Sequence, residues 1–108
     1  MSEKKRIMGR VFVGIPQDPP VQLMSQLVRY LEQQDKVYIA YMLQMYKEAE
    51  MSYLLVLGFK DRVEDENTIQ EISKISKPFL DKYNMDICLL STRFGITAVN
   101  GKEPFFHV

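Results

Sequence analysis

The spacing of apolar residues divides the chain into alternating strands and helices. Runs of β-branched and aromatic residues predict four strands, at residues 11–15, 37–45, 53–59 and 85–90. Apolar residues that recur every three or four positions predict two amphipathic helices, at residues 21–34 and 69–83. This order favours an α+β, ferredoxin-like βαββαβ sandwich: a four-stranded antiparallel sheet with two helices on one face and a C-terminal tail.

Prolines and capping residues refine the boundaries of these elements. Three prolines make residues 14–20 a stiff loop that cannot join a sheet ladder, and Asp18 is expected to cap the helix that follows. Pro78 falls inside the second helical pattern and predicts a kink or break there. Either Asp65 or Asn67 is expected to cap that second helix.

The two middle strands are apolar on both faces, which marks them as central in the sheet. Two helices cover only one face, so either the C-terminal tail or another protein molecule must cover the other. Tyr38, Met42 and Tyr46 alternate along one face of the second strand and have the side chains favoured at interfaces. Together with Phe105 and Phe106 of the tail they are the candidate interface residues, and a homodimer is the expected assembly.

Length, charge and composition predict a single domain with neither a nucleic-acid nor a membrane partner. The 108 residues suit one domain, which we expect at residues 10–108 after a disordered tail at residues 1–9. Fourteen basic and fourteen acidic side chains give no net charge, which argues against a nucleic-acid partner. No apolar run approaches the ~20 residues of a membrane span, so no membrane partner is expected. The single Cys88 forms no internal disulfide and favours a cytoplasmic location.

The inventory of reactive residues favours a non-enzymatic protein-interaction or regulatory module, with a protein as a possible partner. One cysteine and one histidine cannot build a structural zinc cluster within one chain. Cys88 lies in a predicted strand as an inert core residue, and His107 is expected to be solvated near the chain end. Gly14 stands alone, without the further glycines of a phosphate-binding loop. We therefore expect no catalytic residue, metal or cofactor, unless a site is completed across a dimer interface.

The alternative function is the sensing of a small molecule, such as an amino acid. Amino-acid-sensing regulatory domains share this element order and bind ligands at the first strand-to-helix loop or at a dimer interface. The candidate ligand-binding residues are Gly14, Gln17 and Asp18 of that loop together with Arg93. Asp18 would hold an ammonium group and Arg93 a carboxylate, through charge-assisted hydrogen bonds.

Several motifs, taken in order, resemble those of one known family. They are the Gly-x-Pro loop at residues 13–20, an Ala-Tyr pair at residues 37–42, the apolar run at residues 52–59, and Gly-Ile-Thr at residues 95–97 followed by Glu-Pro-Phe-Phe at residues 103–106. This series is similar to the C-terminal domain of the enhanced serine sensitivity protein (SseB) family, over residues 10–107. The resemblance implies a bacterial cytoplasmic protein with a regulatory or binding role, and it supplies no catalytic residues. Phe106 stands where the family commonly has a tyrosine, so that hydroxyl is missing here.

Overall fold

The computed structural model describes residues 11–108, so the tail expected at residues 1–9 lies outside the described residues. The elements are β1 (Val11–Gly14), α2 (Val21–Leu31), β2 (Val37–Lys47), β3 (Glu50–Phe59), α3 (Glu66–Ser76), the 3-10 turn η1 (Lys77–Phe79), β4 (Asn84–Leu89), α4 (Arg93–Val99) and β5 (Phe106–His107). The four predicted strands and both predicted helices are present, but the second helix, predicted at residues 69–83, ends at Ser76. The short α4 and β5 lie in the segment expected to be a C-terminal tail.

The strands form one mixed sheet in the order β1-β2-β3-β4, and β5 pairs with β2. β1, β3 and β5 all run antiparallel to β2, whereas β3 and β4 run parallel. The α+β class is therefore confirmed, but the prediction of a purely antiparallel, four-stranded sheet is wrong. The long crossover through α3 lets β4 return parallel to β3, as a tight hairpin could not. The ferredoxin-like arrangement is not confirmed by these pairings.

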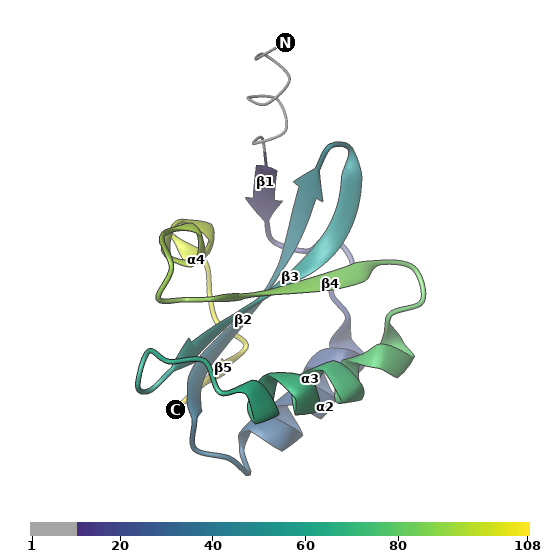
Figure 1. Cartoon of the computed structure of the whole chain (residues 1–108). Helices are drawn as coiled ribbons and strands as arrows, with labels where there is room; N and C mark the ends of the chain where they lie inside the picture. Colours follow the sequence, from purple (N-terminus) through teal and green to yellow (C-terminus); the bar gives the residue numbers. More distant parts are fainter. Residues whose placement is uncertain (1–10) are drawn as a thin grey trace.

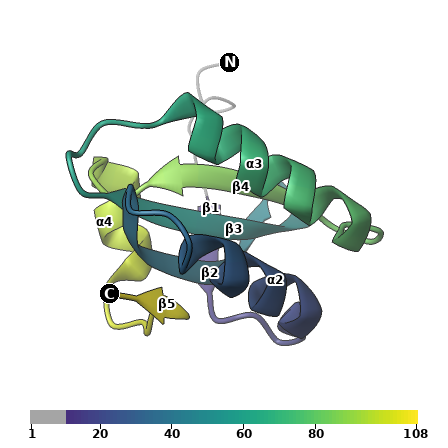
Figure 2. The same cartoon turned by 90° about the horizontal axis from the view of Figure 1, so that it is seen from below.

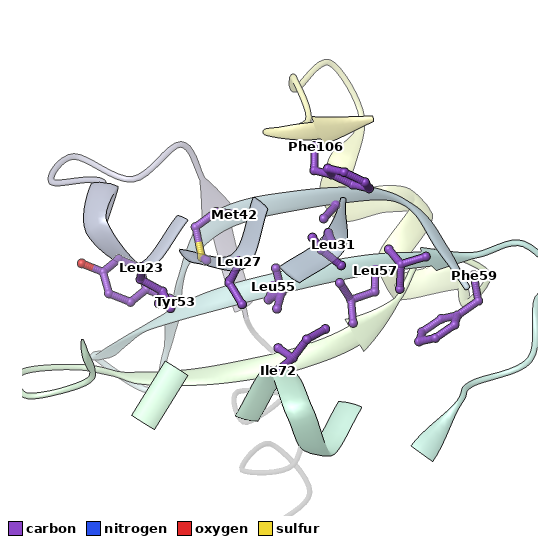
Figure 3. Packing of buried hydrophobic residues seen from close by; sticks show 12 residues of the cluster. Leu23, Leu27, Leu31, Met42, Tyr53, Leu55, Leu57, Phe59, Ile72 and Phe106 are labelled. Carbon is purple, nitrogen blue, oxygen red and sulfur yellow. The ribbon is translucent and has the colours of Figure 1, made fainter. Parts of the chain in front are cut away.

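The helices α2 and α3 lie side by side on one face of the sheet (Figures 1 and 2). Leu23, Leu27 and Leu31 recur every four residues along α2 and are at most 1% exposed. They meet Leu55 of β3 and Ile72 of α3 in one apolar cluster (Figure 3). Burying each such side chain stabilises the fold by about 1.5–3 kcal/mol before cavity effects.

The opposite face of the sheet is covered by the chain itself. Leu43, Leu54 and Val56 of the central strands pack there with Ala98 of α4, and half-buried Val99 lies against them. The sequence predicted that either the C-terminal tail or another protein molecule covers this face. In the structure the C-terminal segment packs on it. Beyond α4 the chain passes the edge of β2, and Phe106 enters the cluster on the other face (Figure 3).

The start and end of α3 follow from local chemistry. The Asp65 carboxylate accepts a hydrogen bond from the Thr68 amide at 3.0 Å, so Asp65 and not Asn67 is the cap. Hydrogen bonds from the Thr68 side chain and amide hold the pKa of Asp65 below its usual value. The helix ends at Ser76, just before Pro78, and η1 follows it. The predicted break is confirmed.

Candidate ligand-binding groove

A groove of about 500 Å³ lies between the start of α2, strand β3 and the segment that joins α3 to β4. Tyr53, Phe79 and Tyr83 give it aromatic walls, and Asp18, Asp81 and Lys82 give it charged groups of both signs. This volume lies in the range of small-molecule pockets, which usually combine apolar walls with a few polar groups. The groove adjoins the strand-to-helix loop that the sequence singled out.

The first wall of the groove is the proline-rich loop before α2. The Gln17 amide donates to the side-chain oxygen of Gln44 on β2 at 3.2 Å, which ties the loop to the sheet. The Tyr53 hydroxyl donates to the backbone carbonyl of Asp18 at 3.1 Å. The helix begins after Pro20 with no side-chain cap, so the expectation that Asp18 caps it is wrong. Pro19 and Pro20 have no amide hydrogen to donate to such a cap, and the next amide, that of Val21, donates to the Pro19 carbonyl at 2.8 Å. Asp18 lines the groove instead.

The opposite wall is placed by the break in α3. After η1 the chain turns toward β4, and this turn brings Phe79 and Tyr83 to the groove. The rings of Tyr53 and Tyr83 meet edge to face, with centroids 5.6 Å apart and planes at 90°. Such a contact contributes about 0.5–1.5 kcal/mol beyond simple burial, so it fixes the two rings relative to each other.

Burial and a nearby charge both act on the Tyr53 hydroxyl in the groove. Burial raises the pKa of the Tyr53 hydroxyl, and the negative charge of Asp18 and the neighbouring Tyr83 raise it further. Tyr53 therefore stays protonated at neutral pH and remains a hydrogen-bond donor.

The four ligand-binding residues predicted from the sequence are only partly brought together. Asp18 lines the groove, and Gln17 holds its loop to the sheet. Gly14 ends β1, with open space where a side chain would point. Arg93 begins α4, which packs on the other face of the sheet, and it does not line the groove. The expected pairing of Asp18 with Arg93 in one site is therefore wrong.

The other charged and aromatic groups of the groove are not predicted by the sequence pattern. Tyr53 is 8% exposed and lies in a predicted strand, while Tyr83 falls on the apolar face of a predicted helix. Lys82 and Asp81 lie next to Tyr83, after a proline in a helical pattern. The helix break at this proline was the one sequence signal that could have indicated these lining residues. Residues after the break leave the helix and can line a pocket.

The predicted interface residues fall into different environments. Met42 is only 5% exposed and packs beneath α2, so its assignment to an uncovered face is wrong (Figure 3). Alternation along β2 places it on the face that the helices cover. Tyr38 is half-buried beside a small pocket of about 220 Å³. Phe106 is 8% exposed within the first cluster, and half-buried Phe105 packs against that cluster.

Tyr46 is the predicted interface residue that the structure leaves open to solvent. It lies opposite Phe12 of β1 and Met51 of β3, so the three side chains form one row across adjacent strands. We call Phe12, Tyr46 and Met51 the apolar row. Phe12 is 65% exposed and Tyr46 41% exposed. The row lies where the β2–β3 hairpin extends beyond the helices (Figure 1).

The cysteine and the histidine of the chain lie on different strands, Cys88 on β4 and His107 on β5. Burial, and then the Asp86 carboxylate, raise the pKa of the Cys88 thiol to about 11, so almost none of it is the nucleophilic thiolate at neutral pH. His107 is exposed on β5. Within residues 11–108, no three histidine, cysteine, aspartate or glutamate side chains are grouped to hold a metal ion. None of the helices in this described part has the length and apolar character of a membrane crossing.

The structure defines an α+β domain in which the chain's own C-terminal segment packs on the second face of the sheet. The model of the SseB protein C-terminal domain matches residues 8–107, nearly the whole chain. The chain therefore belongs to the SseB C-terminal domain family, as the sequence motifs indicated. Neither the curated proteins nor the solved structures include a match to it.

Proposed function

We propose that this domain is a non-catalytic regulatory module that binds a small ligand in the groove over Tyr53. The observation that carries the proposal is the groove itself: aromatic walls fixed by the Tyr53–Tyr83 contact, with Asp18, Asp81 and Lys82 at their margin. Binding requires this combination of apolar surface and few polar groups, whereas catalysis requires a reactive group as well. The proposal includes a bacterial cytoplasmic setting, which the family resemblance and the single cysteine support.

Thermal melting with millimolar amino acids, amines and other common metabolites tests this function. A ligand at ~100 times its dissociation constant stabilises the native state by about 2.7 kcal/mol, so we expect a saturable rise of several degrees. Gln22→Trp fills the groove from α2 and should abolish the rise. Gln26→Trp is the matched control, because Gln26 is exposed on the same helix, one turn along and outside the groove lining. An equal rise in the Gln22→Trp variant would show that the ligand binds elsewhere, and a flat panel would contradict small-molecule binding.

The second candidate is self-association as a homodimer through the apolar row. Its support is the exposure of Phe12 and Tyr46 on neighbouring strands, since adjacent exposed aromatics are typical of interface centres. The absence of net charge leaves no overall repulsion between two copies.

Light scattering coupled to size exclusion tests the dimer. We expect twice the monomer mass for the wild type, and a dissociation constant raised about ten-fold or more for Phe12→Ser and for Tyr46→Ser. Val63→Ser is the control, because Val63 is also exposed (68%) but lies in the loop between β3 and α3. A monomeric wild type, or equal weakening by Val63→Ser, would contradict this interface.

A further inference from the structure

We infer that the groove over Tyr53 recognises a protonated amine carried on a small apolar body. This inference rests on the proposed ligand-binding function and names the chemistry of its ligand. The ammonium group would lie against the tyrosine rings and the Asp18 side of the groove, and the apolar body would lie along the aromatic walls.

The aromatic walls are suited to a cation. The perpendicular rings of Tyr53 and Tyr83 form a corner, and Phe79 adds a third ring to the lining. The face of an aromatic ring attracts an ammonium group within about 6 Å, and the attraction grows when water is partly excluded. Because the edge-to-face contact fixes the corner in advance, little ordering of these rings is required when a ligand binds.

The oxygen atoms at the groove point to the same chemistry. The Asp18 carbonyl accepts one hydrogen bond, from the Tyr53 hydroxyl, and a carbonyl oxygen has a second lone pair that an ammonium group can use. Asp18 and Asp81 line the groove together with one basic residue, Lys82, so acidic residues outnumber basic ones in the lining. The Asp18 charge that raises the pKa of Tyr53 would stabilise a cation at the same place.

Lys82 would distinguish two kinds of ligand that carry an ammonium group, a simple amine and an amino acid. A simple amine would use the carboxylates and the rings alone, whereas an amino acid would also offer a carboxylate to Lys82. An anion without an amine would meet two carboxylates and one lysine. A neutral molecule would gain only apolar burial.

Calorimetric titration with four small molecules tests the inference. Each carries a phenyl ring, and they differ in their polar groups: phenethylamine, phenylalanine, hydrocinnamate and phenethyl alcohol. We expect phenethylamine to bind at least about ten-fold more tightly than hydrocinnamate or phenethyl alcohol. Asp18→Asn keeps the backbone carbonyl but removes the charge, and it should weaken phenethylamine about ten-fold. Asp61→Asn removes the same charge from an exposed loop outside the groove and should leave the affinity unchanged.

The outcomes separate the inference from the function on which it rests. If hydrocinnamate or phenethyl alcohol binds as tightly as phenethylamine and Gln22→Trp blocks all of them, the groove binds ligands but the inferred chemistry is wrong. If the wild type binds none of the four, or if Asp18→Asn changes nothing, the inference is overturned as well. Tighter binding of phenylalanine that is lost in Lys82→Gln assigns an amino acid, whereas equal or weaker binding assigns a simple amine.

Discussion

Gly95→Ala should lower the free energy of unfolding by about 3 kcal/mol, a large effect for the addition of one methyl group. A β-carbon at position 95 would overlap the carbonyl oxygen of Leu89 and lie 3.1 Å from the Cα of Leu90. Both are backbone atoms, so no side-chain rotation relieves the overlap. The Thr92 side chain accepts a hydrogen bond from the Gly95 amide at 3.0 Å, so α4 is also fixed in place by its cap.

Chemical denaturation measures this effect, with Gly14→Ala as the matched control. Gly14 has open space around the position of a β-carbon, so the same substitution there should change the free energy of unfolding by less than about 0.5 kcal/mol. A loss of ~3 kcal/mol should lower the melting temperature by more than about 10 °C in a domain of this size. If Gly95→Ala is as stable as Gly14→Ala, the close approach of α4 to the end of β4 is not present in solution.

Phe106→Ala should lower the free energy of unfolding by about 3 kcal/mol. Phe106 is 8% exposed and packs in the apolar cluster under α2, although it lies in a strand of only two residues. Removal of a buried aromatic ring loses its transfer free energy and leaves a cavity, which costs about 3–5 kcal/mol in protein cores. The value here lies near the lower end because the ring sits at the edge of the sheet (Figure 3).

The control for this variant is the next residue along the chain. His107 is exposed and pairs with Ile39 through its backbone, so His107→Ala should keep the strand and change stability by less than about 0.5 kcal/mol. Amide hydrogen exchange provides a second measurement. Phe106→Ala should speed exchange of the Phe105 and Val108 amides, which donate to Ala40 and Tyr38 of β2. Equal unfolding free energies for the two variants would mean that the ring does not anchor the segment.

The elements that sequence predicted well are those with long, regular patterns. Apolar residues at helical spacing predicted α2, although Val21 of that pattern is 68% exposed. Pro78 ends the regular part of the next helix, α3. The strands β2 and β3 are apolar on both faces, and both faces are indeed buried over much of their length. The spacing of apolar residues along an element follows which of its faces is buried, and these predictions rest on that spacing.

The missed elements have too few residues to show a period. α4 has seven residues and includes Gly95 and three β-branched side chains, all weaker helix formers than alanine or leucine. Its signal was the cap: Thr92 stands three residues before Gly95, in the position of a helix-capping side chain. β5 has two residues, and only its pairing with β2 defines it as a strand.

Strand pairing and groove lining depend on contacts between distant segments, which no local pattern encodes. Nothing in residues 84–89 distinguishes a strand parallel to β3 from an antiparallel one. Met42 was placed on the wrong face because alternation shows which residues share a face but not which face the helices cover. The Tyr53–Tyr83 corner joins residues 30 positions apart in sequence, so only the folded chain reveals it.

The pairing of β2 has a consequence for synthesis on the ribosome. One side of β2 pairs with β3, and the other side pairs with both β1 and β5, the first and the last strands of the described residues. The N-terminus of a nascent chain leaves the ribosome first. The strands β1, β2 and β3 can therefore assemble while β5, which pairs with residues 39–40, is still inside the exit tunnel. During that interval this stretch of edge offers unpaired backbone groups to any strand nearby. Until residues 106–107 have left the tunnel and paired with residues 39–40, another strand can occupy that stretch of the β2 edge.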